Sequence, residues 1–528
     1  MLHSENRFSS KKSFHTLTLS LVVILLAACG HGNRQKDITI EAFSDMKEPL
    51  FVVNGNDVKN AIAKMCNETP TRNTADARTR KYYEEGGAMV WVNRYGVRNN
   101  AHLLLRHLKE SVPAIGFSES AFYISPIEAD LKRFDELDFD SGENSVSKVL
   151  ARLEYNMTRA CARYIIGQRY GFTNPNYTFN RLDSMMSNTT NKFIGFRLLY
   201  DLKSERPSDS FIDELTRKIA NDSIAEYLAE AEPQDTLYRQ LKGMLQTAHG
   251  SQRTKIMTNM ERCRWRFEHS NTNEGKTLVV NIPSFMLQAY EGGRCTMEMK
   301  IGCGERKTKT PILYSQVERI EINPQWHIPM SIITKDIVRH IGDTAYFERN
   351  KYYVADRKTG ERIDIGEVTA AMLHSGEYRV SQEGGEGNSL GRIVFRFKNN
   401  MSVYLHDTNS RGFFSRDVRA ISHGCVRVER PFDLATFVLG ESVDEWTLDK
   451  IRISMDLPPK TDKGKKYVRQ HEEETHNLIS NKAINPPIPV YILYFTLFPN
   501  ATGSIESYPD IYGYDAVIEK EMTTYTNL

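Results

Sequence analysis

The chain has 528 residues, of which 40% are hydrophobic and 26% charged, and its formal net charge at neutral pH is +2. This length predicts more than one domain, and the composition is that of a folded protein with ample apolar material for a large core. A net charge so close to zero gives no support to functions that depend on a polyanionic partner, and the sequence contains no nucleic-acid-binding motif.

Residues 1–28 predict a signal peptide. A basic start, which includes Arg7 and Lys11, precedes an apolar run from Leu17 to Ala28. The run is too short to span a bilayer comfortably, and a basic start followed by such a run is typical of a cleaved signal.

The apolar run ends in Leu26-Ala27-Ala28-Cys29-Gly30, which resembles the bacterial lipobox. The resemblance implies that Cys29 is acylated on sulfur and becomes the mature N-terminus, with a tether over residues 29–37. Each buried methylene of an acyl chain would stabilise membrane attachment by about 0.8 kcal/mol. No later segment is long and apolar enough to span a membrane. We therefore expect a periplasmic protein held at the cell envelope by its lipid alone, although an ordinary signal peptide with an incidental Cys29 is the alternative.

Residues 38–270 have a mainly helical pattern. Apolar residues recur every three or four positions along two segments, which is typical of helices with one buried face. These residues are Leu104, Leu105 and Leu108 in the first segment, and Leu150, Leu153, Met157, Cys161, Tyr164 and Ile165 in the second. We expect a helical scaffold domain here.

The pattern becomes β-like near Lys276. Strands are expected at 277–282, 312–322, 393–397, 403–405 and 488–495. A helical part followed by a β-rich part predicts an α+β fold. We expect a β-rich domain over 271–456, a charged loop or helix over 457–483, and a C-terminal strand and extension over 484–528 that packs on both domains.

The seven cysteines do not form a disulfide framework. They include no CxxC pair and no zinc-finger spacing. Cys295 and Cys303 lie in or beside one expected strand, and the sequence leaves a bridge between them open.

The segment Ser422-His423-Gly424-Cys425 carries the clearest chemistry. A thiol becomes a good nucleophile only when ionised, so its pKa must fall or a base must take its proton. His406, nineteen residues before Cys425, is of the type that takes a proton near neutral pH. Gly424 allows a tight turn whose amide hydrogens face a substrate carbonyl. A buried cysteine and a satisfied core histidine are the commoner interpretation of such a pair when it stands alone.

The whole string weighs against that interpretation. His406, fifteen intervening residues and then Ser-His-Gly-Cys resemble the signature of the L,D-transpeptidase catalytic domain. The resemblance continues in Thr310-Pro311, in 323–329 with Trp326, in 388–392 with Asn388, and in 510–515, and the last of these is similar to the large, scaffold-bearing subtype. It covers most of the chain after residue 50.

The resemblance implies a set of roles for individual residues. Cys425 would be the nucleophile and His406 its general base, while His423 and Gly424 shape the turn and backbone amides around Gly424 and Cys425 supply the oxyanion hole. Substrate-binding positions would be Ser422, Trp326, Asn388 and Arg427. For Arg427, a pair with a substrate carboxylate and an ion pair that fixes the loop are equally open. Asp407 either orients His406 or closes a turn.

The activity implied is peptidoglycan cross-linking. The thiol would attack a donor stem peptide, a D-residue would leave, and an amine of an acceptor stem would resolve the thioester. Residues 331–379 resemble the subtype's capping insertion, which would exclude water from the thioester. The resemblance implies no metal and no organic cofactor, and we expect a monomer. The subtype often carries a wall-binding domain between its scaffold helices and catalytic domain, and residues 241–255 leave no room for one.

Two other functions remain open. The same site could act as an L,D-carboxypeptidase or hydrolase of wall stem peptides, because both reactions use the same thioester. A non-catalytic wall-binding lipoprotein is the alternative from another class, and the intact His406 and Cys425 speak against it.

Overall fold

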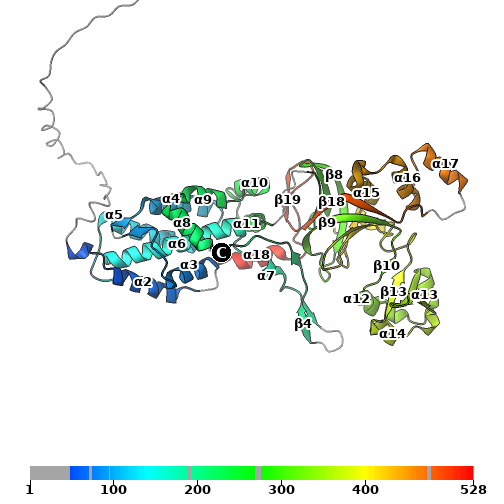
Figure 1. Ribbon diagram of the computed structural model, residues 1–528, viewed down its shortest axis with the longest axis horizontal. Coiled ribbons are helices and arrows are strands. Elements are labelled where there is room, and N and C mark those ends of the chain that lie inside the picture. The colour runs from blue at the N-terminus through cyan, green and yellow to red at the C-terminus, as the bar shows by residue number, and fades with distance from the viewer. Residues whose placement is uncertain are drawn as a thin grey trace, which may run out of the picture.

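The computed structural model describes residues 48–70, 74–93, 95–186, 192–267, 275–471 and 477–526. Cys29 and the rest of the expected signal peptide and tether lie outside these ranges. The described residues form an elongated molecule with a helical part at one end and a β-rich part at the other (Figure 1). The expected α+β fold is confirmed.

The helical part is organised around α6 (Val146–Tyr170), a helix buried on nearly every side. The helix predicted for this segment is confirmed, and all six of its marker residues are at most 1% exposed. The prediction of a single buried face is wrong, because neighbouring helices cover the other faces as well. The other helices are α2 (Gly55–Glu68), α3 (Thr74–Glu84), α4 (Asn99–Ala114), α5 (Ile124–Glu136), α7 (Pro175–Phe179), α8 (Phe211–Ala220), α9 (Ile224–Ala231), α10 (Thr236–Leu245) and α11 (Gly250–Arg264).

The mainly helical character expected for 38–270 is confirmed, although several short strands interrupt it. β1 (Val92–Asn93) and β2 (Gly96–Val97) form a small antiparallel pair. β3 (Ser184–Met186) and β4 (Phe193–Phe196) form a protruding hairpin whose apolar residues are exposed, and β5 (Tyr200–Asp201) joins the main sheet. These strands are too short to produce a period of two that could be recognised in the sequence.

The β-rich part is a ten-stranded sheet of the described residues in the order β14-β15-β17-β8-β7-β6-β18-β9-β5, with β16 beside β8. β9 also pairs with β14, so the sheet closes on itself. Its strands, besides β5, are β6 (Lys276–Asn281), β7 (Met286–Glu291), β8 (Arg294–Gly304), β9 (Ile312–Ile322), β14 (Ile393–Phe397), β15 (Leu405–His406), β16 (Ala420–Ser422), β17 (Val426–Val428) and β18 (Asn481–Leu493). Closure buries the apolar faces of the strands and leaves few free edges.

Cys295 and Cys303 both lie in β8, and both thiols are free. Eight residues of strand separate them by about 26 Å at ~3.3 Å per residue. A bridge between them is therefore impossible without breaking the strand.

Residues 326–382 form a separate body below the sheet in Figure 1. Its strand order is β10-β13-β11-β12, and its buried residues make a hydrophobic cluster distinct from the main core. The elements are β10 (Trp326–His327), α12 (Met330–Ile332), α13 (Thr344–Arg349), β11 (Tyr352–Asp356), β12 (Arg362–Ile363), α14 (Ala370–Ser375) and β13 (Tyr378–Gln382). This body, called the cap below, contains the segment 331–379.

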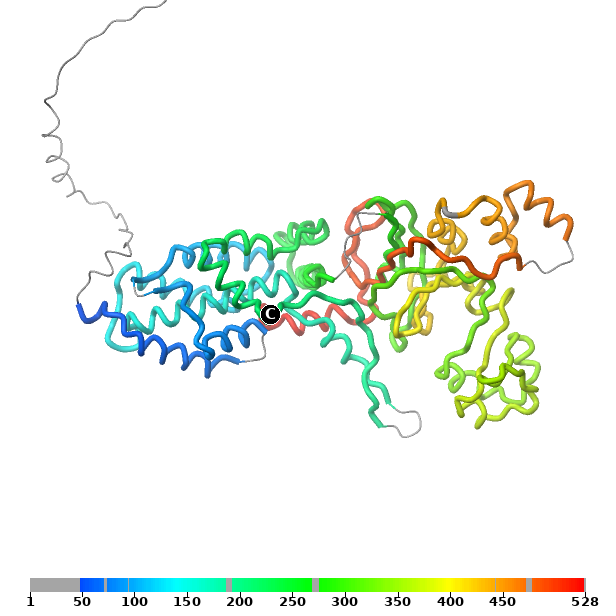
Figure 2. Tube along the Cα trace, viewed as in Figure 1, coloured from blue at the N-terminus to red at the C-terminus, as the bar shows by residue number. Residues whose placement is uncertain are grey.

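The C-terminal segment links the two main parts. After the helices α15 (Pro431–Leu439), α16 (Glu445–Ser454) and α17 (Asp462–Gln470), the chain crosses the sheet as β18 and continues through β19 (Leu497–Pro499) and β20 (Ile505–Ser507). It then returns to the helical part as α18 (Tyr514–Met522), drawn in red in Figure 2. The backbone N–H of Ser118 donates to the carbonyl of Tyr525 at 2.8 Å. Buried residues of the helical part, the sheet and α18 form one hydrophobic cluster.

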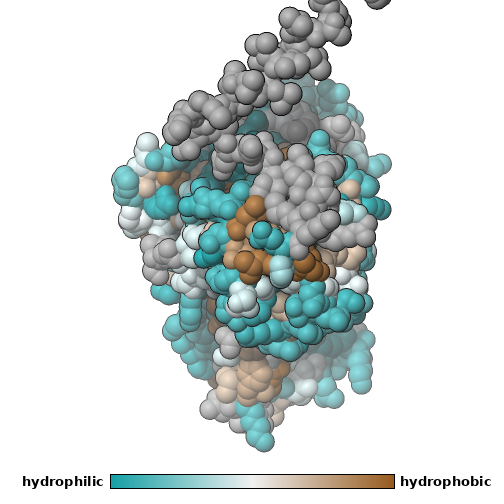
Figure 3. All heavy atoms as spheres, turned by 90° about the vertical axis from the view of Figure 1, so that its left-hand side faces the viewer, coloured by the Kyte–Doolittle hydropathy of each residue, from teal (hydrophilic) through white to brown (hydrophobic). Residues whose placement is uncertain are grey.

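On the face that Figure 3 shows, hydrophilic residues predominate, and apolar side chains gather near its middle and again toward its lower end. Within the described ranges, no helix combines the length and the apolar character needed to cross a bilayer. The same residues contain no group of three or more histidine, cysteine or acidic side chains placed to hold a metal ion.

The separate cap core generates a testable prediction. Phe347 is fully buried in the cap cluster, so Phe347→Ala should destabilise the cap by about 3–5 kcal/mol. Hydrogen exchange followed by mass spectrometry should show lost protection within 326–382 and unchanged protection in the sheet. The matched control is Phe395→Ala in the main core, which should expose the sheet and the helical part together. Loss of protection in the sheet of the Phe347→Ala variant would contradict the independence of the cap.

Candidate active site

Cys425 lies in the turn between β16 and β17, and hydrogen bonds from Ser422 shape this turn. The Ser422 hydroxyl donates to the carbonyl of Cys425 at 2.6 Å and accepts from the N–H of Gly424 at 3.1 Å. Gly424 has φ +124°, a conformation that side-chain-bearing residues rarely adopt. The turn therefore requires glycine at this position. Ser422 was expected to bind substrate, but its hydroxyl is used within the turn and the residue is only 3% exposed.

His406 lies on the neighbouring parallel strand. The register pairs Leu405 with Val426 and His406 with Arg427, which places His406 diagonally across from Cys425. Ordinary strand spacings put the two α-carbons about 8 Å apart on the same face. No hydrogen bond joins the side chains of His406 and Cys425 in this structure. The Cys425 thiol instead points to the carbonyl of Ser402 at 3.7 Å.

The imidazole of His406 is fixed by its own loop. Its Nδ1 lies 2.5 Å from the carbonyl of Asp407. A carbonyl can only accept, so this contact places the proton on Nδ1 and leaves the lone pair on Nε2. The backbone of Asp407 thus orients His406, while its carboxylate closes the loop by accepting from the Arg392 N–H at 2.9 Å and pairing with Arg411 at 3.0 Å. Both roles considered for Asp407 are therefore present.

Both reacting groups are neutral at rest. Burial and the positive charge of Arg427 lower the pKa of His406 to about 3, although the carbonyls of Asp407 and Leu390 oppose the shift. Burial raises the pKa of Cys425 to about 11, and the Tyr404 N–H and the guanidinium groups of Arg396 and Arg427 counter part of the rise. Between these two pKa values the pair is a thiol and a neutral imidazole. The site has a base ready to accept a proton rather than a standing thiolate.

Arg427 has no ion pair in the described part of the chain. Its guanidinium lies 5.8 Å from the ring centre of Phe413, and its Nε is buried without a hydrogen-bond partner. The interpretation of Arg427 as half of a loop-fixing ion pair is therefore wrong, and the cation stays available beside Cys425.

Three other expected site residues have different surroundings. Asn388 is 1% exposed, and its side chain bonds to the backbone of Pro324, Glu383 and Leu390, so it closes a loop and has no free group for a substrate. Trp326 packs against the cap core at the base of the cap. His423 is exposed at the turn.

Tyr404 and Arg396 were missed as site residues. Continuing the strand register by one residue places Tyr404 opposite Cys425 and Arg396 opposite Tyr404. The Arg396 guanidinium lies 4.5 Å from the Tyr404 ring centre and pairs with Glu321 at 2.7 Å. Strand alternation could have identified Tyr404, because it stands two residues before His406.

A cavity of about 760 Å³ adjoins the loop that follows His406. Asp407, Thr408 and Arg411 line one side of it, and the start of α15 lines another. Neither Cys425 nor His406 lines this cavity, so it lies beside the reacting groups and does not contain them.

The fold and the site together define a protein with a cysteine–histidine pair built into a closed sheet and braced by a helical part. Residues 275–453 match the family model described as the L,D-transpeptidase catalytic domain, and residues 77–245 match the Scaffold domain model. The chain therefore carries an L,D-transpeptidase catalytic domain and a Scaffold domain, which confirms the resemblance found in the sequence.

One curated relative is a Haemophilus influenzae protein that bears the provisional name L,D-transpeptidase. The two are 29% identical over 327 residues, which is 60% of this chain and 60% of the relative. The chain is thus matched over less than two thirds of that relative's length.

Two solved structures are also similar. An L,D-transpeptidase from Mycobacterium smegmatis is 14% identical, with 31% of this chain and 52% of that chain covered and a TM-score of 0.17. A mutant of the Enterococcus faecium L,D-transpeptidase is 10% identical, with 50% and 72% covered and a TM-score of 0.18. These scores are too low to support a structural conclusion, so the assignment of the two domains depends on the family models.

The pKa values of the pair predict an unusual reactivity profile. The rate at which iodoacetamide alkylates Cys425 should rise about tenfold per pH unit up to pH ~10, because the thiolate fraction is set by a pKa of about 11. No inflection should occur between pH 5 and 8, since His406 is already neutral there. Peptide mass spectrometry would follow Cys425 separately from the half-buried Cys295, which serves as an internal comparison. A plateau below pH 8 would instead indicate a thiolate–imidazolium pair.

Proposed function

We propose that this protein is a peptidoglycan L,D-transpeptidase that cross-links stem peptides through a thioester on Cys425. The observation that carries the proposal is the arrangement of two residues within a matching catalytic domain. Cys425 sits in a glycine-dependent turn, and a neutral His406 whose Nδ1 faces the Asp407 carbonyl lies on the adjacent strand.

The first half of the reaction forms the thioester. As Sγ bonds to the donor carbonyl carbon, the thiol proton passes to Nε2 of His406, after a small side-chain movement brings the two groups within about 3 Å. The carbonyl oxygen becomes an oxyanion. The carbon–nitrogen bond then breaks, and the proton on His406 passes to the departing amine of the D-residue.

The second half transfers the acyl group. An amine on an acceptor stem loses a proton to His406 as it attacks the thioester carbon. The carbon–sulfur bond then breaks, and the departing thiolate takes that proton back from His406. Water attacking in place of the amine would release the shortened donor, which is the carboxypeptidase alternative.

The oxyanion needs a donor that is free at rest. The Gly424 N–H is already bonded to Ser422. The Cys425 N–H donates to no acceptor within the described residues and is the better candidate. Of the two backbone amides expected to supply the oxyanion hole, we therefore propose the Cys425 N–H and not the Gly424 N–H.

Arg427 is proposed to bind a stem carboxylate. Its guanidinium lies on the same sheet face as Cys425 and lacks a protein counter-ion among the described residues. A carboxylate supplied by the substrate would compensate the buried charge.

The cap is proposed to keep water from the thioester. His327 at the base of the cap is close enough to Arg396 for their charges to interact, and Arg396 in turn acts on Cys425. The base of the cap therefore lies near Arg396 and Cys425. Closure over the site stays a prediction.

The proposal is tested with a disaccharide-tetrapeptide and mass spectrometry of the products. The wild-type protein should form cross-linked dimers and release the terminal D-residue, and Cys425→Ala should do neither. His406→Ala should lower the rate by about 10²–10⁴-fold at neutral pH, with partial recovery at high pH where hydroxide ionises the thiol. The control is Cys295→Ala, which removes another half-buried thiol and should leave activity unchanged. Activity in the Cys425→Ala variant would refute the nucleophile assignment.

We also propose that the protein is lipid-anchored in the periplasm through Cys29. The support is the lipobox-like sequence before Cys29. In a bacterial host, Cys29→Ser should remove labelling by a fatty-acid probe and shift the protein out of the membrane fraction. Ser9→Cys, which adds a cysteine before the apolar run, serves as a control that should not restore the label. Unchanged label and pelleting of Cys29→Ser would exclude this anchor.

A further inference from the structure

The nucleophile turn rests on the loop between β8 and β9. The hydroxyl of Thr308 donates to the carbonyl of Ser422 at 2.9 Å, and the hydroxyl of Thr310 donates to the carbonyl of Gly424 at 2.8 Å. Thr310 Oγ1 also accepts from the Gly304 N–H at 2.8 Å. A hydroxyl has a single proton, and the Gly304 N–H supplies its own, so the Thr310 proton goes to Gly424.

This contact fixes more than a carbonyl. The carbonyl of Gly424 and the N–H of Cys425 belong to the same peptide unit, which is planar and trans, so the two groups point in opposite directions. Holding the carbonyl toward Thr310 aims the N–H away from the loop. The glycine at φ +124° has an unusually wide range of accessible conformations, so without this bond the peptide could rotate.

Tyr512 holds Thr310 in turn. Its hydroxyl accepts from the Thr310 N–H at 3.1 Å and donates to the carbonyl of Gly304 at 2.6 Å, which joins the two ends of the loop. Thr310 is fully buried and Tyr512 is 4% exposed, so water does not replace these bonds. Burial raises the pKa of Tyr512, and its hydroxyl therefore stays protonated and able to donate.

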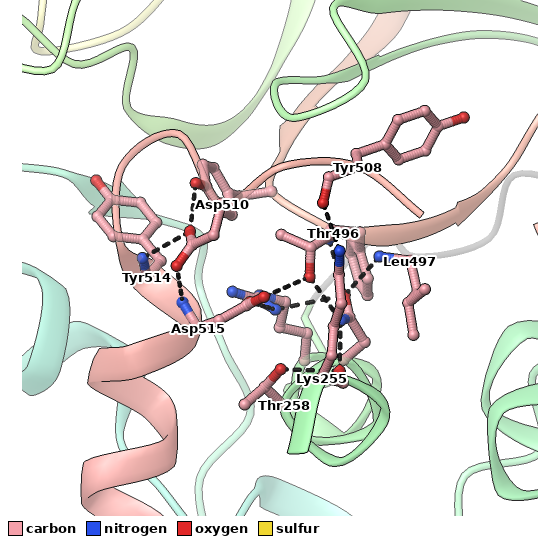
Figure 4. Close-up of polar contacts among 12 residues, drawn as sticks. Lys255, Thr258, Thr496, Leu497, Tyr508, Asp510, Tyr514 and Asp515 are labelled. Carbon is pink, nitrogen blue, oxygen red and sulfur yellow. Dashed lines mark hydrogen bonds and ion pairs between the residues drawn. The ribbon is translucent and has the colours of Figure 1, made fainter. Parts of the chain in front are cut away.

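The chain of bonds continues to the C-terminal extension. The N–H of Tyr512 donates to the Tyr494 hydroxyl at 2.8 Å, and that hydroxyl donates to Asp510 at 2.6 Å. Asp510 also accepts the backbone N–H groups of Tyr514 and Asp515, and Figure 4 shows its carboxylate lying beside both.

The last links belong to the scaffold. Asp515 pairs with Arg262 of α11 at 2.6 Å and accepts from Thr496, which faces it in Figure 4. Thr496 is bonded to Asn259 of α11 through both its backbone and its hydroxyl. An unbroken series of short polar contacts thus connects the scaffold helix α11 to the peptide bond before Cys425.

We propose that Thr310 and Tyr512 are positioning residues that orient the Cys425 N–H toward the developing oxyanion, and that α11 of the scaffold holds them in place through Asp510 and Asp515. The inference rests on the proposed function and deepens it. It gives the scaffold domain a part in acyl transfer that needs no contact with substrate.

The test compares two reactions of the same thiol in the full-length protein. When a carbapenem acylates Cys425, the thiol attacks a carbonyl and an oxyanion forms. When iodoacetamide alkylates Cys425, no oxyanion forms. Thr310→Val should slow acylation by up to the ~10²-fold that a lost oxyanion donor costs, and should change alkylation by less than about threefold. Tyr512→Phe should give a smaller loss of acylation, and Asp515→Asn a smaller one still, because each acts through more bonds.

Two variants control for simple disruption. Thr310→Ser keeps the hydroxyl and should recover most of the acylation rate. Tyr508→Phe removes a hydroxyl from the same C-terminal segment. That hydroxyl bonds to the surface residue Glu506 at 3.0 Å, and both rates should stay at the wild-type value. Melting temperatures identify any variant that unfolds. If Thr310→Val unfolds, the ratio of acylation rate to alkylation rate in Tyr512→Phe decides whether the positioning role holds.

The outcomes separate the two proposals. Wild-type acylation rates in both Thr310→Val and Tyr512→Phe, or an equal fall in acylation and alkylation, would overturn the positioning role and leave the proposed function standing. A wild-type protein that carbapenem does not acylate at Cys425 would overturn both.

Discussion

The desolvation of the half-buried Cys425 thiol and the buried His406 imidazole is the constraint on which the rest of the site depends. A low-dielectric environment disfavours charge, so the thiol is held as a thiol and the imidazole as a neutral base. Such a pair cannot depend on a thiolate that is already present. The proposed reaction must instead create charge during the attack, and only groups already aimed at that charge can stabilise it without reorganisation.

This requirement explains why so much of the surrounding polarity is fixed. The carbonyl of Asp407 sets the tautomer of His406, Ser422 closes the turn, and Thr310 holds the peptide before the thiol. The bonds to Asp407 and from Thr310 are buried and the Ser422 bond is partly buried. Breaking a buried one would leave a polar group unpaired at a cost of about 1–3 kcal/mol. The two arginines near Cys425 differ in their ion pairing. Glu321 neutralises Arg396, whereas Arg427 has no counter-ion among the described residues. Arg427 is thus available to pair with an anion that enters the site.

Much of this could be predicted from local sequence, and the remainder could not for a physical reason. The helix α6, the α+β division and the family signature at His406 and Cys425 all depend on residues close together in the chain. The roles of Asn388, Ser422 and Arg427 depend on what lies beside them in space. Asn388 bonds to backbone of the 324 and 383 loops, and Arg427 proved to lack the acid that an ion pair needs. The closure of the sheet by β9 and β14, and the two-residue strand β5, are likewise long-range pairings without a sequence period.

The two parts attached to the sheet are coupled to it in opposite ways. The scaffold shares the main hydrophobic core and is tied to the nucleophile turn through buried polar bonds, so a displacement of α11 relative to the sheet would break contacts that lead to Gly424. The cap has its own core and joins the sheet through the chain on either side of β10 and β13. It can therefore move as a unit without exposing the main core. Substrate entry and exclusion of water require motion, whereas stabilisation of an oxyanion requires its absence. The cap can move because its core is separate, and the scaffold stays rigid because it shares the core of the sheet. The same sheet can therefore admit substrate on one side and hold the oxyanion donor fixed on the other.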